Sequence, residues 1–214
     1  MNYVPGDLRD QLAHVGFDVV QAGLVVGSGG NLSARMPGDD VCWVTAAGTW
    51  LDRLDRPSFV RVCLSDGEVL PGDGARPEVG PTSELALHLA TYRVRPDVNA
   101  VVHLHPQTVL LLDAIGERVR LVTTDHAFYL GEVVATPYRP PGTPELAGEA
   151  AAAAAGGINC VVLGHHGCSV LGDSVEMAHR RARNLEEAAQ LTYRALAAGI
   201  LPTLPECPTT PTHR

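Results

Sequence analysis

Apolar residues recur every three or four positions in several stretches of the chain, the spacing that places them on one face of a helix. Leu8, Leu12, Val15 and Val19 form the first such stretch, with Asp7 placed to cap its start. This spacing, with capping and helix-ending residues, predicts helices over residues 7–26, 83–92, 107–115 and 144–155, and a final helix that follows Ser174 and continues to Gly199.

Short, largely apolar segments separated by Gly, Pro and Asp fill much of the remaining sequence. They predict strands over residues 32–35, 41–45, 59–64, 100–105, 160–163 and 169–171. Because strand and helix signals alternate, we expect an α/β domain in which helices cover a mixed sheet. No internal repeat or linker divides the sequence, so we assign residues 1–200 to one domain and residues 201–214 to a Pro-rich tail.

The charge of the chain narrows the choice of partner. Its 214 residues carry 16 basic and 24 acidic side chains, a formal net charge of −8, without a run of five like charges. This balance disfavours nucleic acid and membrane surfaces as partners, so we expect a small-molecule ligand. No apolar stretch approaches the about 18 residues of a membrane span, and residues 1–9 lack a signal-peptide pattern. We therefore expect a cytoplasmic protein.

All sixteen basic residues are Arg, and the chain has no Lys. This excludes Schiff-base chemistry and covalent attachment of pyridoxal phosphate, both of which need a Lys amine. Carbanion chemistry in this protein would therefore need a metal. The five Cys are scattered and form no Cys-x-x-Cys pair, which indicates reduced thiols rather than disulfides or a thiolate metal site.

Two histidines stand at alternate positions at the end of a predicted strand. His103 and His105 project from the same face, about 7 Å apart along the chain, and could share one metal ion. His165 or His166, in a Gly-flanked turn after another buried strand, offers a third nitrogen. Three imidazoles and a carboxylate suit Zn²⁺, which keeps a replaceable ligand position when it is catalytic.

The candidate carboxylate is Glu84, at the start of the helix predicted over residues 83–92. A Glu in a first helical turn is usually a capping charge. Here Thr82 and Ser83 directly precede it, and their hydroxyls, with the free N–H groups of the turn, suit an anion. Ser28-Gly29-Gly30-Asn31 is a second segment whose backbone can approach an anion closely. Together with a metal, the two segments suggest a phosphorylated hydroxycarbonyl substrate.

A set of short motifs occurs in order along residues 8–198. It comprises Gly30-Asn31-Leu32-Ser33, Thr45-x-x-Gly48, Pro81-Thr82-Ser83-Glu84, Val102-His103-Leu104-His105, Gly142-Thr143, His165-His166-Gly167 and the helix around Leu185-Glu186. This set resembles the class II aldolase and adducin-head superfamily, in particular its L-fuculose-1-phosphate aldolase-like members. The resemblance implies a three-layer α/β/α sandwich with a central mixed, largely antiparallel β-sheet. It also implies a homotetramer with active sites at subunit contacts.

The resemblance further implies roles for individual residues. Zn²⁺, or another divalent ion such as Mn²⁺ or Co²⁺, would be held by His103, His105 and His166, with His165 as a neighbour. Glu84 would be the acid–base group that can also touch the metal. The substrate phosphate would be surrounded by Ser28, Asn31, Gly48, Thr82 and Ser83.

The chain departs from the fuculose-phosphate enzymes in two places. Ala47 stands where they have a Thr, so one hydroxyl donor is missing from the phosphate loop. Where they have a Tyr that protonates the departing fragment, Asp125, His126 and Tyr129 are all candidates for the acid. We expect His88, on the helix after the candidate carboxylate, to be structural.

These features predict a zinc-dependent lyase that cleaves a ketose phosphate or a related hydroxycarbonyl compound by a retro-aldol reaction, through a metal-stabilised enediolate. The alternative is a metal-dependent decarboxylase, dehydratase or pentulose-phosphate 4-epimerase of the same fold, which Ala47 and Asp125-His126 suggest. A non-catalytic module that resembles the adducin head is a third hypothesis, and such a module would need no metal.

Overall fold

The computed structural model describes residues 6–71 and 79–208. Its α-helices are α1 (Leu8–Gln21), α2 (Leu85–Val94), α3 (Gln107–Ala114), α4 (Thr124–Leu130), α5 (Pro144–Ala154) and α6 (Val175–Ala197). Its strands are β1 (Asn31–Arg35), β2 (Val41–Thr45), β3 (Phe59–Cys63), β4 (Val69–Leu70), β5 (Ala100–Leu104), β6 (Val133–Thr136), β7 (Cys160–Leu163) and β8 (Gly167–Gly172). Short 3-10 helices cover Leu51–Arg53, Arg56–Ser58 and Leu201–Thr203. None of the described helices combines the length and apolar character needed to cross a membrane.

The strands form one sheet in the order β4-β3-β2-β1-β5-β8-β7-β6. Neighbouring strands are antiparallel, except for β6 and β7, which are parallel. β5 lies between β1 and β8, so segments far apart in the sequence meet at the centre of the sheet. The sheet is therefore mixed and largely antiparallel, as expected.

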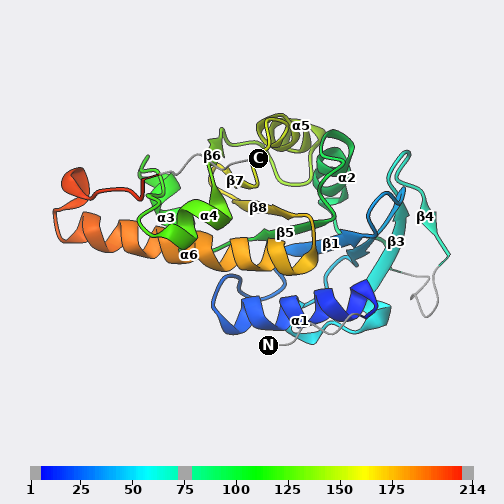
Figure 1. Cartoon of the computed structure of the whole chain (residues 1–214). Helices are drawn as coiled ribbons and strands as arrows, with labels where there is room; N and C mark the ends of the chain where they lie inside the picture. Colours follow the sequence, from blue (N-terminus) through cyan, green and yellow to red (C-terminus); the bar gives the residue numbers. More distant parts are fainter. Residues whose placement is uncertain (1–5, 72–78, 209–214) are drawn as a thin grey trace.

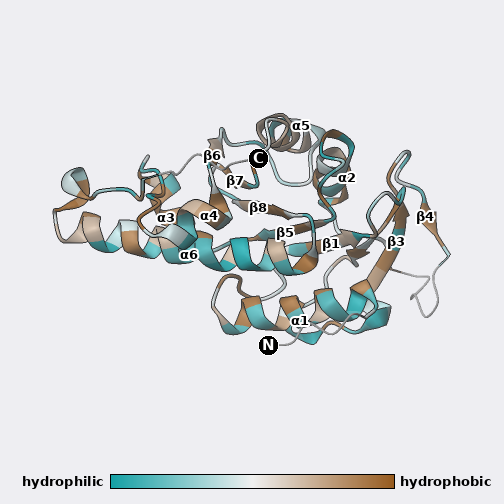
Figure 2. Ribbon diagram, in the orientation of Figure 1, coloured by the Kyte–Doolittle hydropathy of each residue, from teal (hydrophilic) through white to brown (hydrophobic). Residues whose placement is uncertain are grey.

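Helices cover both faces of the sheet, α2 and α5 on one side and α1, α3, α4 and α6 on the other (Figure 1). An apolar core lies between the sheet and each helical layer. Apolar and polar segments alternate along α1 and α6, as expected for helices that bury one face (Figure 2). The expected three-layer α/β/α sandwich is confirmed.

Successive side chains of a strand point to opposite faces of the sheet, and several polar side chains of the central strands therefore face α2. On β5, Val102 and Leu104 lie in the apolar core that includes residues of α6, so His103 points to the opposite face of the sheet. On β1 the apolar residues also join that core, so Asn31 and Ser33 face α2. This row of polar groups, together with the start of α2, forms the candidate site.

The first helix is shorter than the apolar pattern predicts. It ends at Gln21, not at residue 26. Gly23, at φ +73°, donates to the carbonyl oxygen of Val20, and Leu24 donates to that of Val19. These paired hydrogen bonds form a Schellman motif, which ends a helix through a left-handed residue. The apolar residues that follow belong to a loop, so the prediction is wrong at this end.

The sequence pattern also missed α4, β4 and β6. α4 has seven residues, too few for a helical apolar pattern to stand out, and it begins where the Thr123 hydroxyl accepts a hydrogen bond from the N–H of His126. β4 has two residues and β6 has four. The remaining predicted elements are present, with boundaries that differ by a few residues.

The residues after α6 return to the domain as far as residue 208. Glu206 forms ion pairs with Arg118 and Arg120, and the N–H of Cys207 donates to the carbonyl of Leu121 at 2.7 Å. This part of the predicted tail is therefore packed on the domain. Residues 209–214 of that tail lie outside the described residues.

Glu186 on α6 ties that helix to the segment that follows His105. Its carboxylate is 6% exposed and accepts hydrogen bonds from the backbone N–H groups of Thr108 and Val109, each at 3.2 Å. The Thr108 hydroxyl also donates to it, at 2.5 Å. These backbone groups belong to the first turn of α3, so a side chain of one helix caps another.

Replacing Glu186 by Ala should lower the free energy of unfolding by about 2–4 kcal/mol, because buried N–H groups lose their acceptor. Urea denaturation measures the change. Glu187→Ala, at the neighbouring side chain that is 68% exposed, is the matched control. It should cost less than about 1 kcal/mol. Equal losses in the two variants would contradict the capping role.

Candidate active site

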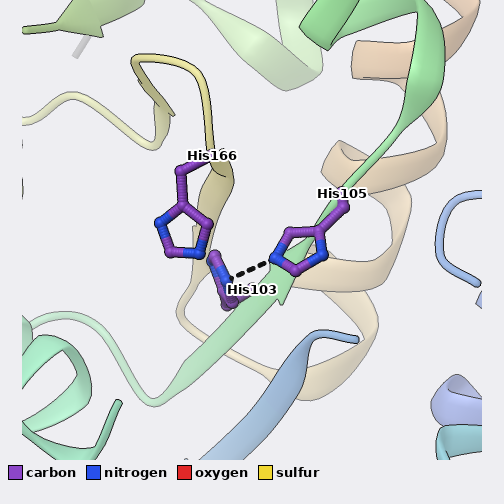
Figure 3. A group of neighbouring side chains, drawn as sticks. All are labelled: His103, His105 and His166. Atoms are coloured by element: carbon purple, nitrogen blue, oxygen red, sulfur yellow. Dashed lines mark hydrogen bonds between the residues drawn. The ribbon is translucent and has the colours of Figure 1, made fainter. Parts of the chain in front are cut away.

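Three histidines converge where β5 ends and β8 begins (Figure 3). His103 lies on β5, His105 follows one residue after that strand, and His166 lies in the turn between β7 and β8. Their ring centroids are 4.9, 4.9 and 5.2 Å apart. One ring nitrogen from each lies within 4.8 Å of the others, so the three could hold one metal ion.

The backbone of the turn decides which of its two histidines faces inward. His165 adopts φ +56°, and its side chain is exposed. The ring of His166 instead lies against those of His103 and His105. Gly167 follows, and a Cβ at this position would lie 2.6 Å from Cδ2 of His105, so only glycine lets the turn approach this closely.

Glu84 joins the histidines from the start of α2. It is the N-cap residue rather than part of the first turn as predicted, and its side chain caps no N–H group of the helix. Its Oε2 lies 2.9 Å from Nε2 of His103 and accepts from Nδ2 of Asn31 at 3.0 Å. Its Oε1 lies 3.4 Å from Nε2 of His166. Glu84 is 6% exposed, and its carboxylate thus faces the histidines and not the helix.

The polar atoms at this point fit a bound cation. Nδ1 of His103 donates to the carbonyl of Cys168 at 3.0 Å, so its Nε2 presents a lone pair. That lone pair faces Oε2 of Glu84 and Nε2 of His105, at 2.9 and 3.0 Å. Oε1 of Glu84 and Nδ1 of His166 are buried without a hydrogen-bond partner. A divalent cation would stabilise this gathering of lone pairs and negative charge, and the donor set suits zinc.

Burial favours the protonation states that metal binding requires. Burial, followed by the charges of His103 and His166, lowers the pKa of His105 to about 4. Burial also lowers the pKa of His166. Burial alone would raise the pKa of Glu84, but the contact with His103 and the hydrogen bond from Asn31 outweigh it and hold this pKa below its usual range. At neutral pH the carboxylate of Glu84 is therefore ionised, and the imidazoles of His105 and His166 beside it are neutral.

A cavity of about 230 Å³ opens beside Glu84, His105 and His166. Among the residues that line it are all those expected to bind the phosphate, namely Ser28, Asn31, Gly48, Thr82 and Ser83. The described residues of its wall include no Arg. An anion in this cavity would therefore be held by hydroxyl, amide and backbone N–H groups rather than by a cationic side chain.

Two polar side chains of the cavity wall already have partners. Asn31 donates to Glu84 through Nδ2, and its Oδ1 lies 2.6 Å from Nε2 of His88. The hydroxyl of Thr49 donates to the carbonyl oxygen of residue 46, at 2.9 Å. Thr49 is thus committed to its own loop and does not replace the hydroxyl that Ala47 lacks.

The three candidates for the general acid lie elsewhere in the chain. Asp125, His126 and Tyr129 belong to α4 and are not among the described residues that line the cavity. His126 is fully buried. Tyr129 accepts a hydrogen bond from Arg180 at 3.2 Å through its hydroxyl. The structure does not bring these side chains to the histidines of the same chain.

Sequence reasoning missed a group of buried residues behind Glu84. His88, expected to be structural, is hydrogen-bonded to both Asn31 and Ser33, and Ser33 is in turn bonded to Tyr92. A sequence signal was present. Glu84, His88 and Tyr92 stand four residues apart along a helix, and Asn31 and Ser33 stand two apart on a strand.

Known proteins share this sequence pattern over most of the chain. Residues 10–193 match the family model of the Class II Aldolase and Adducin N-terminal domain. The chain is 33% identical to 3-oxo-tetronate 4-phosphate decarboxylase of Escherichia coli (strain K12) over 195 residues, 89% of this chain and 88% of the relative. It is 34% identical to L-fuculose phosphate aldolase of Methanocaldococcus jannaschii over 168 residues, 78% of this chain and 86% of the relative.

A comparison with solved structures supports the same family. A solved structure of L-fuculose 1-phosphate aldolase matches with a TM-score of 0.81 and 25% sequence identity, covering 96% of this chain and 92% of that one. Fold and site together define an α/β domain of the class II aldolase type. The chain belongs to the class II aldolase and adducin N-terminal domain family.

The two neighbouring histidines provide a test of the metal site. His166→Asn should weaken zinc binding by more than about 100-fold, a larger effect than loss of a supporting hydrogen bond. His165→Asn should leave zinc affinity unchanged, because that side chain points to solvent and Asn tolerates its positive φ. Competition with a chromophoric chelator measures both affinities. A larger loss in His165→Asn would contradict this assignment.

Proposed function

We propose that the chain is a divalent-metal-dependent lyase that cleaves a ketose phosphate or a related hydroxycarbonyl compound by a retro-aldol reaction. The observation that carries this proposal is the buried carboxylate of Glu84, with one unpartnered oxygen, beside three converging imidazoles. A carboxylate next to a metal site supplies the acid–base group and the electrophile that cleavage beside a carbonyl needs. The relatives named as aldolases support this class of reaction.

We expect the metal to be Zn²⁺, with Mn²⁺ or Co²⁺ as ions that the same donors would accept. When bound, the cation would act as a Lewis acid and stabilise the negative charge that develops on the substrate as the carbon–carbon bond breaks. His103, His105 and His166 would hold it. The hydrogen bond from His103 to the carbonyl of Cys168 orients that ring and leaves Nε2 as the donor atom.

Glu84 is the group that moves the proton in this proposal. Asn31 holds its Oε2, which leaves Oε1, free of hydrogen bonds, to accept a proton from the substrate and return it. The phosphate would lie in the same cavity, against the residues of its two loops and the start of α2, namely Ser28, Asn31, Gly48, Thr82 and Ser83.

Decarboxylation is the second candidate function. A relative that is 33% identical bears the name 3-oxo-tetronate 4-phosphate decarboxylase, and Ala47 lacks a hydroxyl on the anion loop. Loss of carbon dioxide from a β-keto acid leaves a carbanion beside a carbonyl, which the same metal site would stabilise. Dehydration and pentulose-phosphate 4-epimerisation belong to this alternative.

For the assembly we propose a homotetramer with active sites at subunit contacts. Phe128 on α4 is 73% exposed, with the Tyr129 ring against it. An exposed aromatic side chain of this size suits a surface that is covered by a partner. In its own chain α4 does not line the cavity. In the proposed tetramer, a neighbouring copy would supply an α4 residue to it. The five free thiols support a cytoplasmic location.

A substrate panel tests the function. Purified, zinc-loaded protein should release an aldehyde from a ketose phosphate, measured with a coupled reductase assay. Release of carbon dioxide from β-keto acid phosphates, without aldehyde from any ketose phosphate, would favour the decarboxylase and contradict the aldolase. Stoichiometric zinc binding with no turnover of ketose phosphates, β-keto acid phosphates, dehydratase substrates or pentulose phosphates would contradict both.

The role of Glu84 is tested by Glu84→Gln, which keeps the shape of the side chain and removes its proton-accepting oxygen. We expect kcat to fall about 10²- to 10⁴-fold while zinc remains bound. Initial rates and elemental analysis measure the two quantities. Glu149→Gln, at a carboxylate paired with Arg139 on the surface, is the control and should keep the full rate. An unchanged rate in Glu84→Gln would exclude this role.

A further inference from the structure

A buried series of hydrogen bonds, the Tyr92–Glu84 relay, runs behind the candidate active site. Tyr92 OH lies 2.8 Å from Ser33 Oγ, and Ser33 Oγ lies 2.7 Å from His88 Nδ1. His88 Nε2 lies 2.6 Å from Asn31 Oδ1, and Asn31 Nδ2 lies 3.0 Å from Glu84 Oε2. Ser33 and His88 are 0% exposed and Tyr92 is 2% exposed, so each polar group depends on its neighbours in the relay.

The relay is possible because the spacing of a strand matches that of a helix. Asn31 and Ser33 are alternate residues of β1, so both point toward α2. Glu84, His88 and Tyr92 are four residues apart, so they lie along one face of α2 and its N-cap. Each side chain of β1 therefore sits between two side chains of the helix.

The direction of every hydrogen bond in the relay follows from its last acceptor. The Glu84 carboxylate only accepts, so Asn31 turns its Nδ2 toward Glu84 and its Oδ1 toward His88. His88 must then donate through Nε2, which leaves Nδ1 as an acceptor for the Ser33 hydroxyl. Ser33 in turn accepts from Tyr92. A single tautomer of His88 satisfies the whole relay.

The surroundings of His88 hold it neutral. Burial, followed by the charge of His103, lowers the pKa of His88 to about 3. A protonated ring would also donate through both nitrogens, which the hydroxyl of Ser33 could accept only by turning its proton away from the ring. The neutral ring, with its proton on Nε2, is the form that the relay accommodates.

We propose that His88 is a positioning residue which, as the neutral Nε2–H tautomer, fixes the orientation of the Asn31 amide and thereby aims the Glu84 carboxylate at the substrate. The inference rests on the proposed role of Glu84 as the proton-transfer group. Without the bond from His88, the Asn31 amide is free to rotate, and its oxygen rather than its NH₂ group can then face the carboxylate. Glu84 Oε2 would lose its donor, and the unpartnered Oε1 would no longer be held beside Nε2 of His166, from which it lies 3.4 Å away.

Two substitutions at one site test this role. His88→Leu fills the space without a donor, and we expect kcat to fall at least about tenfold, with KM and zinc content unchanged. His88→Gln offers an amide N–H near the position of Nε2 and should restore most of the rate. Thr91→Val is the control, because it removes another buried hydrogen bond of α2, from Thr91 to the carbonyl of Leu87 at 2.8 Å. It should lower the melting temperature but keep kcat.

A double variant separates positioning from general destabilisation. In the Glu84→Gln background, His88→Leu should cause no further loss of kcat, because both changes act through one carboxylate. Multiplied losses in the double variant, full kcat in His88→Leu, or an equal kcat loss in Thr91→Val would each overturn the proposal. Should Glu84→Gln alone keep the full rate, the proposed function of Glu84 fails, and this result is distinct from a failure confined to His88.

A measurement on the unmodified protein covers the case in which His88→Leu does not fold. Nitrogen-15 spectra of histidine-labelled protein distinguish the two neutral tautomers. We expect His88 to remain neutral with its proton on Nε2 from about pH 5 to 9. A proton on Nδ1, or a mixture of tautomers, would overturn the proposal whether or not the protein has activity.

Discussion

The contact between the buried carboxylate of Glu84 and the imidazole of His103 organises the centre of this protein. A carboxylate removed from water is costly unless its charge meets donors or a cation. Here Asn31 on β1 is the donor, and the imidazoles that could hold a cation come from other parts of the chain, with His103 on β5 and His166 ahead of β8. They meet because β5 pairs with both β1 and β8. The fold thus brings together a charge and the groups that stabilise it, which no single segment could supply.

Much of this arrangement could be predicted from strand alternation and from the family resemblance. Alternation along a strand predicted that His103 and His105 would share a face, and the resemblance carried by the ordered motifs implied the three layers of the sandwich. The residues alone did not choose between His165 and His166, because that choice depends on a backbone turn at His165 that has no pattern in the sequence. Local hydrogen bonding decided the remaining differences. A Schellman motif shortened α1, and α4 forms from a capped turn too short for periodicity to reveal.

The relatives, one named as a decarboxylase and another as an aldolase, share one chemical requirement with the site described here. Each reaction leaves negative charge beside a carbonyl group. A cation next to a proton-transfer group would stabilise that charge. Under the proposed function, Glu84 and the histidines would serve this common step. Differences in the bond that breaks must then arise from groups that meet the departing fragment, which in this chain are not supplied by α4 from within the same subunit.

At two glycines, main-chain atoms pack directly against the histidine cluster. A methyl group at Gly29 would lie 2.9 Å from Nδ1 of His105, and one at Gly167 would lie 3.0 Å from Cε1 of His103. On these sides no substitution can alter the lining without displacing a ring. The open rim of the cavity is different, because Ala47 and Ser83 are exposed there. A larger side chain at the rim would reshape the entrance while the three rings keep their positions.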